Sequence, residues 1–129
     1  MSRAIEAVVC IPTFRRPDWL ARTIASVLAQ RTDFGFAVVV VDNDAGAQEG
    51  AARARARFAE VGIETRVVVE SAQGNCHAIN RAFGTALSEF PEARHFLMID
   101  DDEMALPGWL QAMVDTALRE KADIVGGPV

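Results

Sequence analysis

The chain alternates between short, uninterrupted apolar runs and longer segments in which apolar residues recur at helical spacing. The apolar runs cover residues 7–11, 36–41, 66–69 and 95–99, and a similar run, 122–127, lies near the end of the sequence. Strands that are hydrophobic at every position are typical of a parallel sheet that helices cover on both faces. We therefore predict five strands of such a sheet.

The segments between these runs, residues 17–30, 48–62, 76–87 and 108–121, predict four helices, because their apolar residues fall on one side of a helix. The residues expected to face the sheet are Leu20, Ile24, Val27 and Leu28, then Ala51, Ala54, Phe58 and Val61, then Cys76, Ile79, Phe83 and Leu87, and finally Leu110, Met113, Val114, Ala117 and Leu118. Regular alternation of strand and helix predicts right-handed crossovers and an open, twisted, mostly parallel α/β sheet of the Rossmann-like class.

Composition restricts the kinds of protein that this chain can be. Its 129 residues suit one domain, 50% are hydrophobic and 24% charged, and the net charge of −5 disfavours nucleic acid as a partner. Two cysteines, Cys10 and Cys76, are expected to be free buried thiols of a reducing compartment. The sequence has neither a membrane-spanning run nor a signal-peptide pattern, which predicts a cytoplasmic protein. Attachment at the inner face of a membrane would need segments absent from this sequence, and the sequence leaves the oligomeric state open.

Four polar loops follow the first four predicted strands, at residues 12–17, 42–46, 70–75 and 100–107. In a parallel sheet they open on one edge, where ligands of α/β proteins bind. None is a glycine-rich phosphate loop, and the last begins with four consecutive acidic residues. Mg²⁺ or Mn²⁺ would offset their repulsion, since these ions take one or two carboxylates and complete their shell with phosphate oxygens and water. A solvated acidic loop before a helix remains the alternative.

Alternate residues of a strand share a side. If the strand continues through the acidic run, Asp100 and Asp102 face one ligand, whereas Asp101 points the other way, to the backbone or to solvent.

Four stretches in this order, "VVCIPTFRRPDWLARTIASVLAQ", "VVVVDNDAG", "QGNCHAINRAFGTA" and "FLMIDDDEMALPGWL", resemble the donor-binding part of family 2 glycosyltransferases, which are inverting enzymes of the GT-A fold. The last of them is similar to the family's Asp-x-Asp motif. The resemblance covers nearly the whole chain, residues 1–129, and implies that an acceptor-binding part is absent from it. It implies a metal-dependent transfer from a nucleoside-diphosphate sugar (UDP, GDP or dTDP type) to an acceptor hydroxyl, as in bacterial polysaccharide biosynthesis.

The resemblance also implies which residues bind. Those expected to contact the nucleotide sugar are Pro12, Thr13, Phe14, Arg15, Asp42, Asn43, Asp44, Gly74, Asn80, Asp100 and Asp101. Asp102 and Asp100 are expected to ligate Mg²⁺ or Mn²⁺. Arg15 and Arg16 can face phosphate, or can simply be exposed arginines at the start of a helix.

Two departures from the family pattern leave roles open. The second loop reads Asp42-Asn43-Asp44, so which carboxylate meets the base stays open, and Ile79 stands where the family often has arginine. The catalytic base is expected beyond Val129, so we expect the chain alone to be inactive. Two other classes compete with this interpretation: a sugar-nucleotide nucleotidyltransferase, which would carry a glycine-rich first loop, and a non-enzymatic receiver-like module, which would carry acidic residues after the first strand.

Overall fold

The computed structural model describes residues 4–123 and 126, and the elements alternate as predicted. The strands are β1 (Ile5–Thr13), β2 (Gly35–Asp42), β3 (Glu64–Val69) and β4 (His95–Met98), and the helices are α1 (Pro17–Leu28), α2 (Glu49–Phe58), α3 (Asn75–Glu89) and α4 (Trp109–Glu120). Half of the predicted fifth strand, residues 122–127, lies outside the described residues, namely residues 124, 125 and 127. Pro17 occupies the first position of α1, where its missing N–H costs no hydrogen bond.

The sheet has the order β3-β2-β1-β4, and all its pairs are parallel, which confirms the Rossmann-like class. The chain moves outward from β1 to β3 and then crosses to the other side of β1 to form β4. Strand order therefore reverses between β1 and β4, and the loops that leave these two strands diverge. Because Thr13 pairs with Asp42, the carboxyl ends of β1 and β2 are level.

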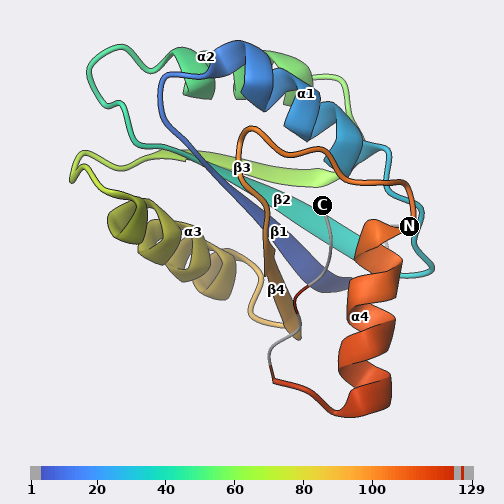
Figure 1. Cartoon of the computed structure of the whole chain (residues 1–129). Coiled ribbons are helices and arrows are strands. Elements are labelled where there is room, and N and C mark those ends of the chain that lie inside the picture. Colours follow the sequence, from blue (N-terminus) through green and yellow to red (C-terminus); the bar gives the residue numbers. More distant parts are fainter. Residues whose placement is uncertain (1–3, 124–125, 127–129) are drawn as a thin grey trace.

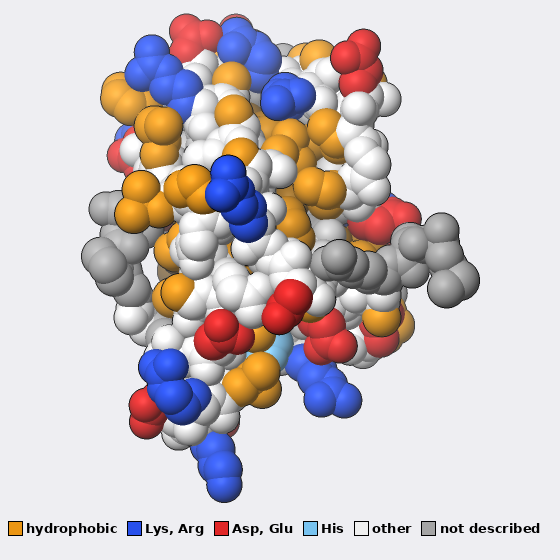
Figure 2. All heavy atoms as spheres, turned by 90° about the vertical axis from the view of Figure 1, so that its right-hand side faces the viewer, with side chains coloured by type: hydrophobic (Ala, Val, Ile, Leu, Met, Phe, Trp, Pro, Cys, Tyr) orange, Lys and Arg blue, Asp and Glu red, His pale blue; other side chains and the backbone are white. Residues whose placement is uncertain are grey.

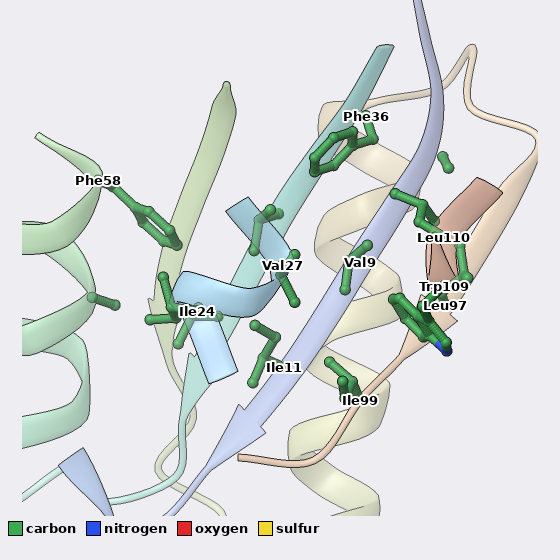
Figure 3. Packing of buried hydrophobic residues seen from close by; sticks show 14 of the residues in the cluster. Val9, Ile11, Ile24, Val27, Phe36, Phe58, Leu97, Ile99, Trp109 and Leu110 are labelled. Carbon is green, nitrogen blue, oxygen red and sulfur yellow. The ribbon is translucent and has the colours of Figure 1, made fainter. Parts of the chain in front are cut away.

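Helices cover both faces of the sheet: α1 and α2 lie over one face and α3 over the other (Figure 1). Successive β1 side chains alternate between two cores, Val9 and Ile11 facing α1, and Val8 and Cys10 facing α3. All four are fully buried, which explains the unbroken apolar run. Figure 3 shows the first core, in which Trp109 and Leu110 at the start of α4 pack beside Leu97 of β4.

The predicted helix stripes are confirmed in part. In α1, Leu20, Ile24 and Val27 are fully buried. In α3, the buried residues are three alanines, Ala78, Ala82 and Ala86. Ile79 and Phe83 of the predicted stripe are half-buried, and Phe83 packs against the same core, but the predicted burial of Cys76 and Leu87 is wrong because both are exposed. The alanine side offers little side-chain volume, which lets the helix lie close against the valines of β1 and β2. Apolar spacing alone could not show which of two neighbouring stripes would face the sheet.

The two cysteines differ. Cys10 is buried as expected, and burial raises the pKa of its thiol to about 12. Cys76 is exposed in the first turn of α3, so its predicted burial is wrong.

The outer side of α4 is open to solvent. Leu110 and Val114 are buried, but Leu118, predicted to face the sheet, is 59% exposed. On this face, hydrophobic side chains reach the surface among charged side chains of both signs (Figure 2). Within the described part of the chain, no helix combines the length and apolarity that crossing a bilayer requires.

One buried carboxylate joins the loops on either side of the strand-order reversal. Asp101, after β4, is 7% exposed, and its Oδ2 accepts hydrogen bonds from the Thr13 hydroxyl at 2.9 Å and the Phe14 N–H at 3.3 Å. The hydroxyl of Thr23, a fully buried residue of α1, lies 2.9 Å from the Asp101 carbonyl oxygen. Side chain and backbone of Asp101 are therefore both anchored to the β1–α1 segment.

We expect Asp101→Asn to lower the free energy of unfolding by about 1–3 kcal/mol, because an amide in this place turns its NH₂ group toward a donor and leaves a buried group unpaired. Urea denaturation of the purified chain measures the change. Asp102→Asn, one residue along and exposed, is the matched control and should change the free energy by less than about 1 kcal/mol. Equal losses in the two variants would show that Asp101 does not hold the loops together.

Candidate functional site

A cavity of about 560 Å³ lies at the carboxyl ends of the strands, where strand order reverses. Its walls come from all four loops predicted to meet there. The lining residues are Pro12, Thr13, Phe14, Arg16, Asn43, Gln73, Gly74, Asn75, Ala78, Asp100, Asp101 and Asp102. The structure thus brings together eight of the predicted site residues, namely Pro12, Thr13, Phe14, Asn43, Gly74, Asp100, Asp101 and Asp102.

The turn after β1 sends its two arginines in different directions. Arg15 has a positive φ of 56°, and its Nε contacts Asp44 Oδ2 at 3.1 Å, so its side chain does not line the cavity. Arg16 does line the cavity, and its Nη1 lies 3.1 Å from Asp102 Oδ2 and 3.5 Å from Asp101 Oδ1. Arg15, which was expected to contact the ligand, thus lies outside the cavity wall, whereas Arg16 forms part of it.

The acidic run forms a turn beyond β4, which ends at Met98. Asp100 and Asp102 are exposed at the cavity, while Asp101 is buried. The predicted separation of Asp101 from its neighbours is thus found, but a turn rather than strand alternation produces it. Of the two predicted environments of Asp101, backbone or solvent, the structure shows the first, since its carboxylate accepts the Phe14 N–H as well as the Thr13 hydroxyl.

Charge in this turn is only partly compensated. Desolvation raises the pKa of Asp100, and the carboxylates of Glu103 and Asp102 raise it further, whereas Arg16 opposes the shift. A raised pKa means that the charged carboxylate is unfavourable in the folded protein. A cation bound at the turn would remove that penalty.

Asp42, one of the two carboxylates that could meet the base, holds the backbone in this structure. Its Oδ1 accepts the Asp44 N–H at 2.9 Å and its Oδ2 accepts the Ala51 N–H at 2.8 Å, at the start of α2. The side chain is 1% exposed and absent from the cavity wall. Gly50 permits this close packing, since a Cβ there would lie 2.9 Å from Thr13 Cγ2. Contact between Asp42 and a base would require these hydrogen bonds to break.

Asn43 holds the opposite loop of the cavity in place. Its Nδ2 donates to the carbonyl oxygens of Glu70 and Ala72, each at 2.9 Å, and its Oδ1 accepts the Gly74 N–H at 3.0 Å. Gly74 has a φ of 133°, which side chains rarely tolerate, and it precedes the first residue of α3, Asn75. The positive end of the α3 dipole therefore opens on the cavity.

Two further predicted residues lie outside the cavity wall. Asn80 is exposed on α3, two positions and so about 200° around the helix from Ala78, which lines the cavity. Asp44 is buried against Arg15.

Sequence reasoning missed three residues. Thr23 supports the acidic turn, and Gln73 and Asn75 line the cavity beside Gly74. Two features of the sequence could have indicated these residues. One is a threonine within the apolar stripe of α1, and the other is the pair of polar residues on either side of a loop glycine.

Comparison with known proteins agrees with this architecture. The family model described as glycosyl transferase family 2 matches residues 8–129. A curated relative, glucosyl-dolichyl phosphate glucuronosyltransferase of Haloferax volcanii, is 32% identical in an alignment 129 residues long that covers 97% of this chain and 38% of the relative. The chain thus spans well under half the length of that relative.

Solved structures share the fold at low sequence identity. TarS 1-349 of S. aureus, in complex with UDP, superposes with a TM-score of 0.72 at 18% identity, over 97% of this chain and 38% of TarS 1-349. The mannosyltransferase PcManGT of Pyrobaculum calidifontis, in complex with GDP-Man and Mn²⁺, gives a TM-score of 0.63 at 22% identity, over 95% of this chain and 33% of PcManGT.

The fold is therefore of the GT-A type. The matched model covers nearly the whole chain, and this decides against the nucleotidyltransferase and the receiver-like module. The chain belongs to glycosyltransferase family 2.

Proposed function

We propose that this chain is the donor-binding part of an inverting, metal-dependent glycosyltransferase. It would bind a nucleoside-diphosphate sugar whose sugar passes to an acceptor hydroxyl. The observation that carries this proposal is the cavity at the strand-order reversal, which exposes two carboxylates, Asp100 and Asp102, and the N-terminus of α3 to the same space. A ligand that combines a cation with a phosphate anion suits such a site.

The residues present fit a divalent cation that the substrate helps to hold. Among the residues that the structure describes, no group of three or more acidic, histidine or cysteine side chains is placed to form a complete cage. Mg²⁺ normally uses one or two carboxylates, substrate phosphates and water, which matches Asp100 and Asp102 beside an open cavity. When bound, such an ion would stabilise the charge that develops on the leaving diphosphate.

Other residues would orient the donor. Phe14 is 39% exposed at the cavity and can cover an aromatic base, with Pro12 beside it in the wall. Asn43 would act through the loop that it holds, because both its donor hydrogens and one lone pair of its oxygen are already used. PcManGT is solved with GDP-Man and Mn²⁺, and TarS with UDP, which supports a nucleotide ligand without choosing its base.

The chemical step needs a general base that removes the proton of the attacking acceptor hydroxyl. We place no residue of this chain in that role. The curated relative is much longer than its match to this chain, and the acceptor site and base are proposed to lie outside residues 1–129. The isolated chain is accordingly proposed to bind donor without turnover.

We expect UDP, GDP or dTDP to bind this chain with Mn²⁺ and not in EDTA, measured by titration calorimetry. Asp102→Asn should abolish the metal-dependent binding and Asp100→Asn should weaken it about tenfold or more, since losing a charged contact costs about 1.5–3 kcal/mol. Asp115→Asn removes an exposed carboxylate of α4 that bonds Gln111, and should leave binding unchanged. Binding of equal strength in EDTA would remove the metal from the proposal, and binding of none of the three would remove the nucleotide.

Cys76 provides an independent test of where the nucleotide binds. The exposed thiol follows Asn75, which lines the cavity, whereas Cys10 is buried with its pKa raised to about 12. A maleimide should therefore modify Cys76 alone in the folded chain, and the nucleotide that binds, together with Mn²⁺, should slow that modification. Mass spectrometry follows the rate, with Cys76→Ser as the control for labelling at Cys10. An unchanged rate at saturating nucleotide would place the ligand away from α3.

A further inference from the structure

Arg16 forms an ion pair with Asp102, one of the two carboxylates proposed to bind the metal. Its Nη1 lies 3.1 Å from Asp102 Oδ2, and this contact is the one side-chain partner found for Asp102 among the described residues. Both side chains are about half exposed, 52% for Arg16 and 48% for Asp102. The pair can therefore open without unfolding any part of the core.

Arg16 also lies near a second carboxylate, that of Asp101, which is itself held in place. Its Nη1 is 3.5 Å from Asp101 Oδ1, and the other oxygen of that carboxylate is fixed by Thr13 and Phe14. The Arg16 backbone is also fixed, because its carbonyl oxygen accepts the Leu20 N–H at the start of α1. The guanidinium can leave Asp102 and still remain at the cavity wall, next to Asp101.

Four consecutive carboxylates, from Asp100 to Glu103, lie in this turn. Within the described chain, Arg16 is the cation that contacts them. In the absence of a metal, its charge reduces their mutual repulsion.

We propose that Arg16 is an exchangeable counter-ion of the donor site. It neutralises Asp102 while the site is empty, yields that oxygen to the divalent cation, and then binds the diphosphate. This inference rests on the proposed function, because it concerns the same metal and diphosphate.

Competition follows from the shared oxygen. A divalent cation bound to this oxygen would repel a guanidinium held at the same atom, because the two carry charge of the same sign. Once released from Asp102, the Arg16 guanidinium can help the metal to bind the diphosphate. A guanidinium offers donors in a planar fork that matches phosphate oxygens, and Arg16 already lines the cavity where the diphosphate would lie.

The two roles predict effects of opposite sign from one substitution. In Arg16→Gln, Mn²⁺ alone should bind about two- to fivefold more tightly, which corresponds to the usual strength of an exposed ion pair. With Mn²⁺ saturating, UDP or GDP should bind about tenfold or more weakly, since a charged contact to phosphate is lost. An arginine with a purely structural role would not tighten the metal and weaken the nucleotide together.

Electron paramagnetic resonance of free Mn²⁺ measures the first constant, and calorimetry of UDP and GDP the second. Arg16→Lys keeps the charge but not the fork, so it should restore metal affinity to the wild-type value and nucleotide affinity only in part. Arg53→Gln is the matched control. It removes an equally exposed arginine that pairs with Asp18 at 2.9 Å, and both affinities should stay at wild type.

Unchanged or weaker Mn²⁺ binding in Arg16→Gln, with metal-dependent nucleotide binding intact in the wild type, would overturn this inference and leave the proposed function standing. Tighter Mn²⁺ in Arg53→Gln as well would reduce the effect to net charge and overturn it too. Mn²⁺ binding by the wild-type chain only in the presence of the nucleotide would overturn this inference alone, whereas no Mn²⁺ binding either with or without the nucleotide would overturn both proposals.

Discussion

The buried carboxylate of Asp101 is the contact on which the geometry of the cavity depends. Parallel strands that leave the sheet on opposite sides of a reversal in strand order carry their loops apart, and nothing in the sheet itself fixes the distance between those loops. Asp101 fixes it by accepting hydrogen bonds from Thr13 and Phe14 across the gap. Since Asp101 is held inward, Asp100 and Asp102 on either side of it are left exposed at the cavity.

Much of the fold could be predicted because strands that are buried on both faces of a sheet are apolar at every position, and such runs are easily recognised in the sequence. Continuous runs such as residues 36–41 can be stable only in a covered sheet, and the alternation with helices then fixes the parallel arrangement. The face that α3 turns to the sheet could not be predicted in the same way. Its alanines are weakly hydrophobic, and their advantage, a close approach to β1 and β2, depends on the shape of the partner surface.

The place of the site followed from topology, whereas the direction of single side chains did not. Loops at the carboxyl ends of parallel strands lie at the same edge of the sheet. The sequence could therefore predict that Thr13, Asn43, Gly74 and the acidic turn lie near one another, as they do in the cavity wall. Whether Asp42 faces a ligand or a backbone N–H depends on where α2 begins, and whether Arg15 or Arg16 enters the cavity depends on one positive φ. Neither the start of α2 nor this positive φ could be predicted from the type or the spacing of the residues.

Three consecutive residues at the end of β2 each hold a different neighbouring segment. Asp42 bonds the first turn of α2, Asn43 bonds the loop before α3, and Asp44 bonds Arg15 in the loop after β1. One short piece of backbone therefore positions three of the segments around the cavity, in addition to the direct contact that Asp101 makes between the loops after β4 and β1. A length change inside this tripeptide would disturb three loops at once, whereas one at Gly46 or Ala47, beyond it, would lengthen a single exposed turn. Relatives that differ in cavity shape are thus expected to vary in loop length beyond this tripeptide and to keep its spacing.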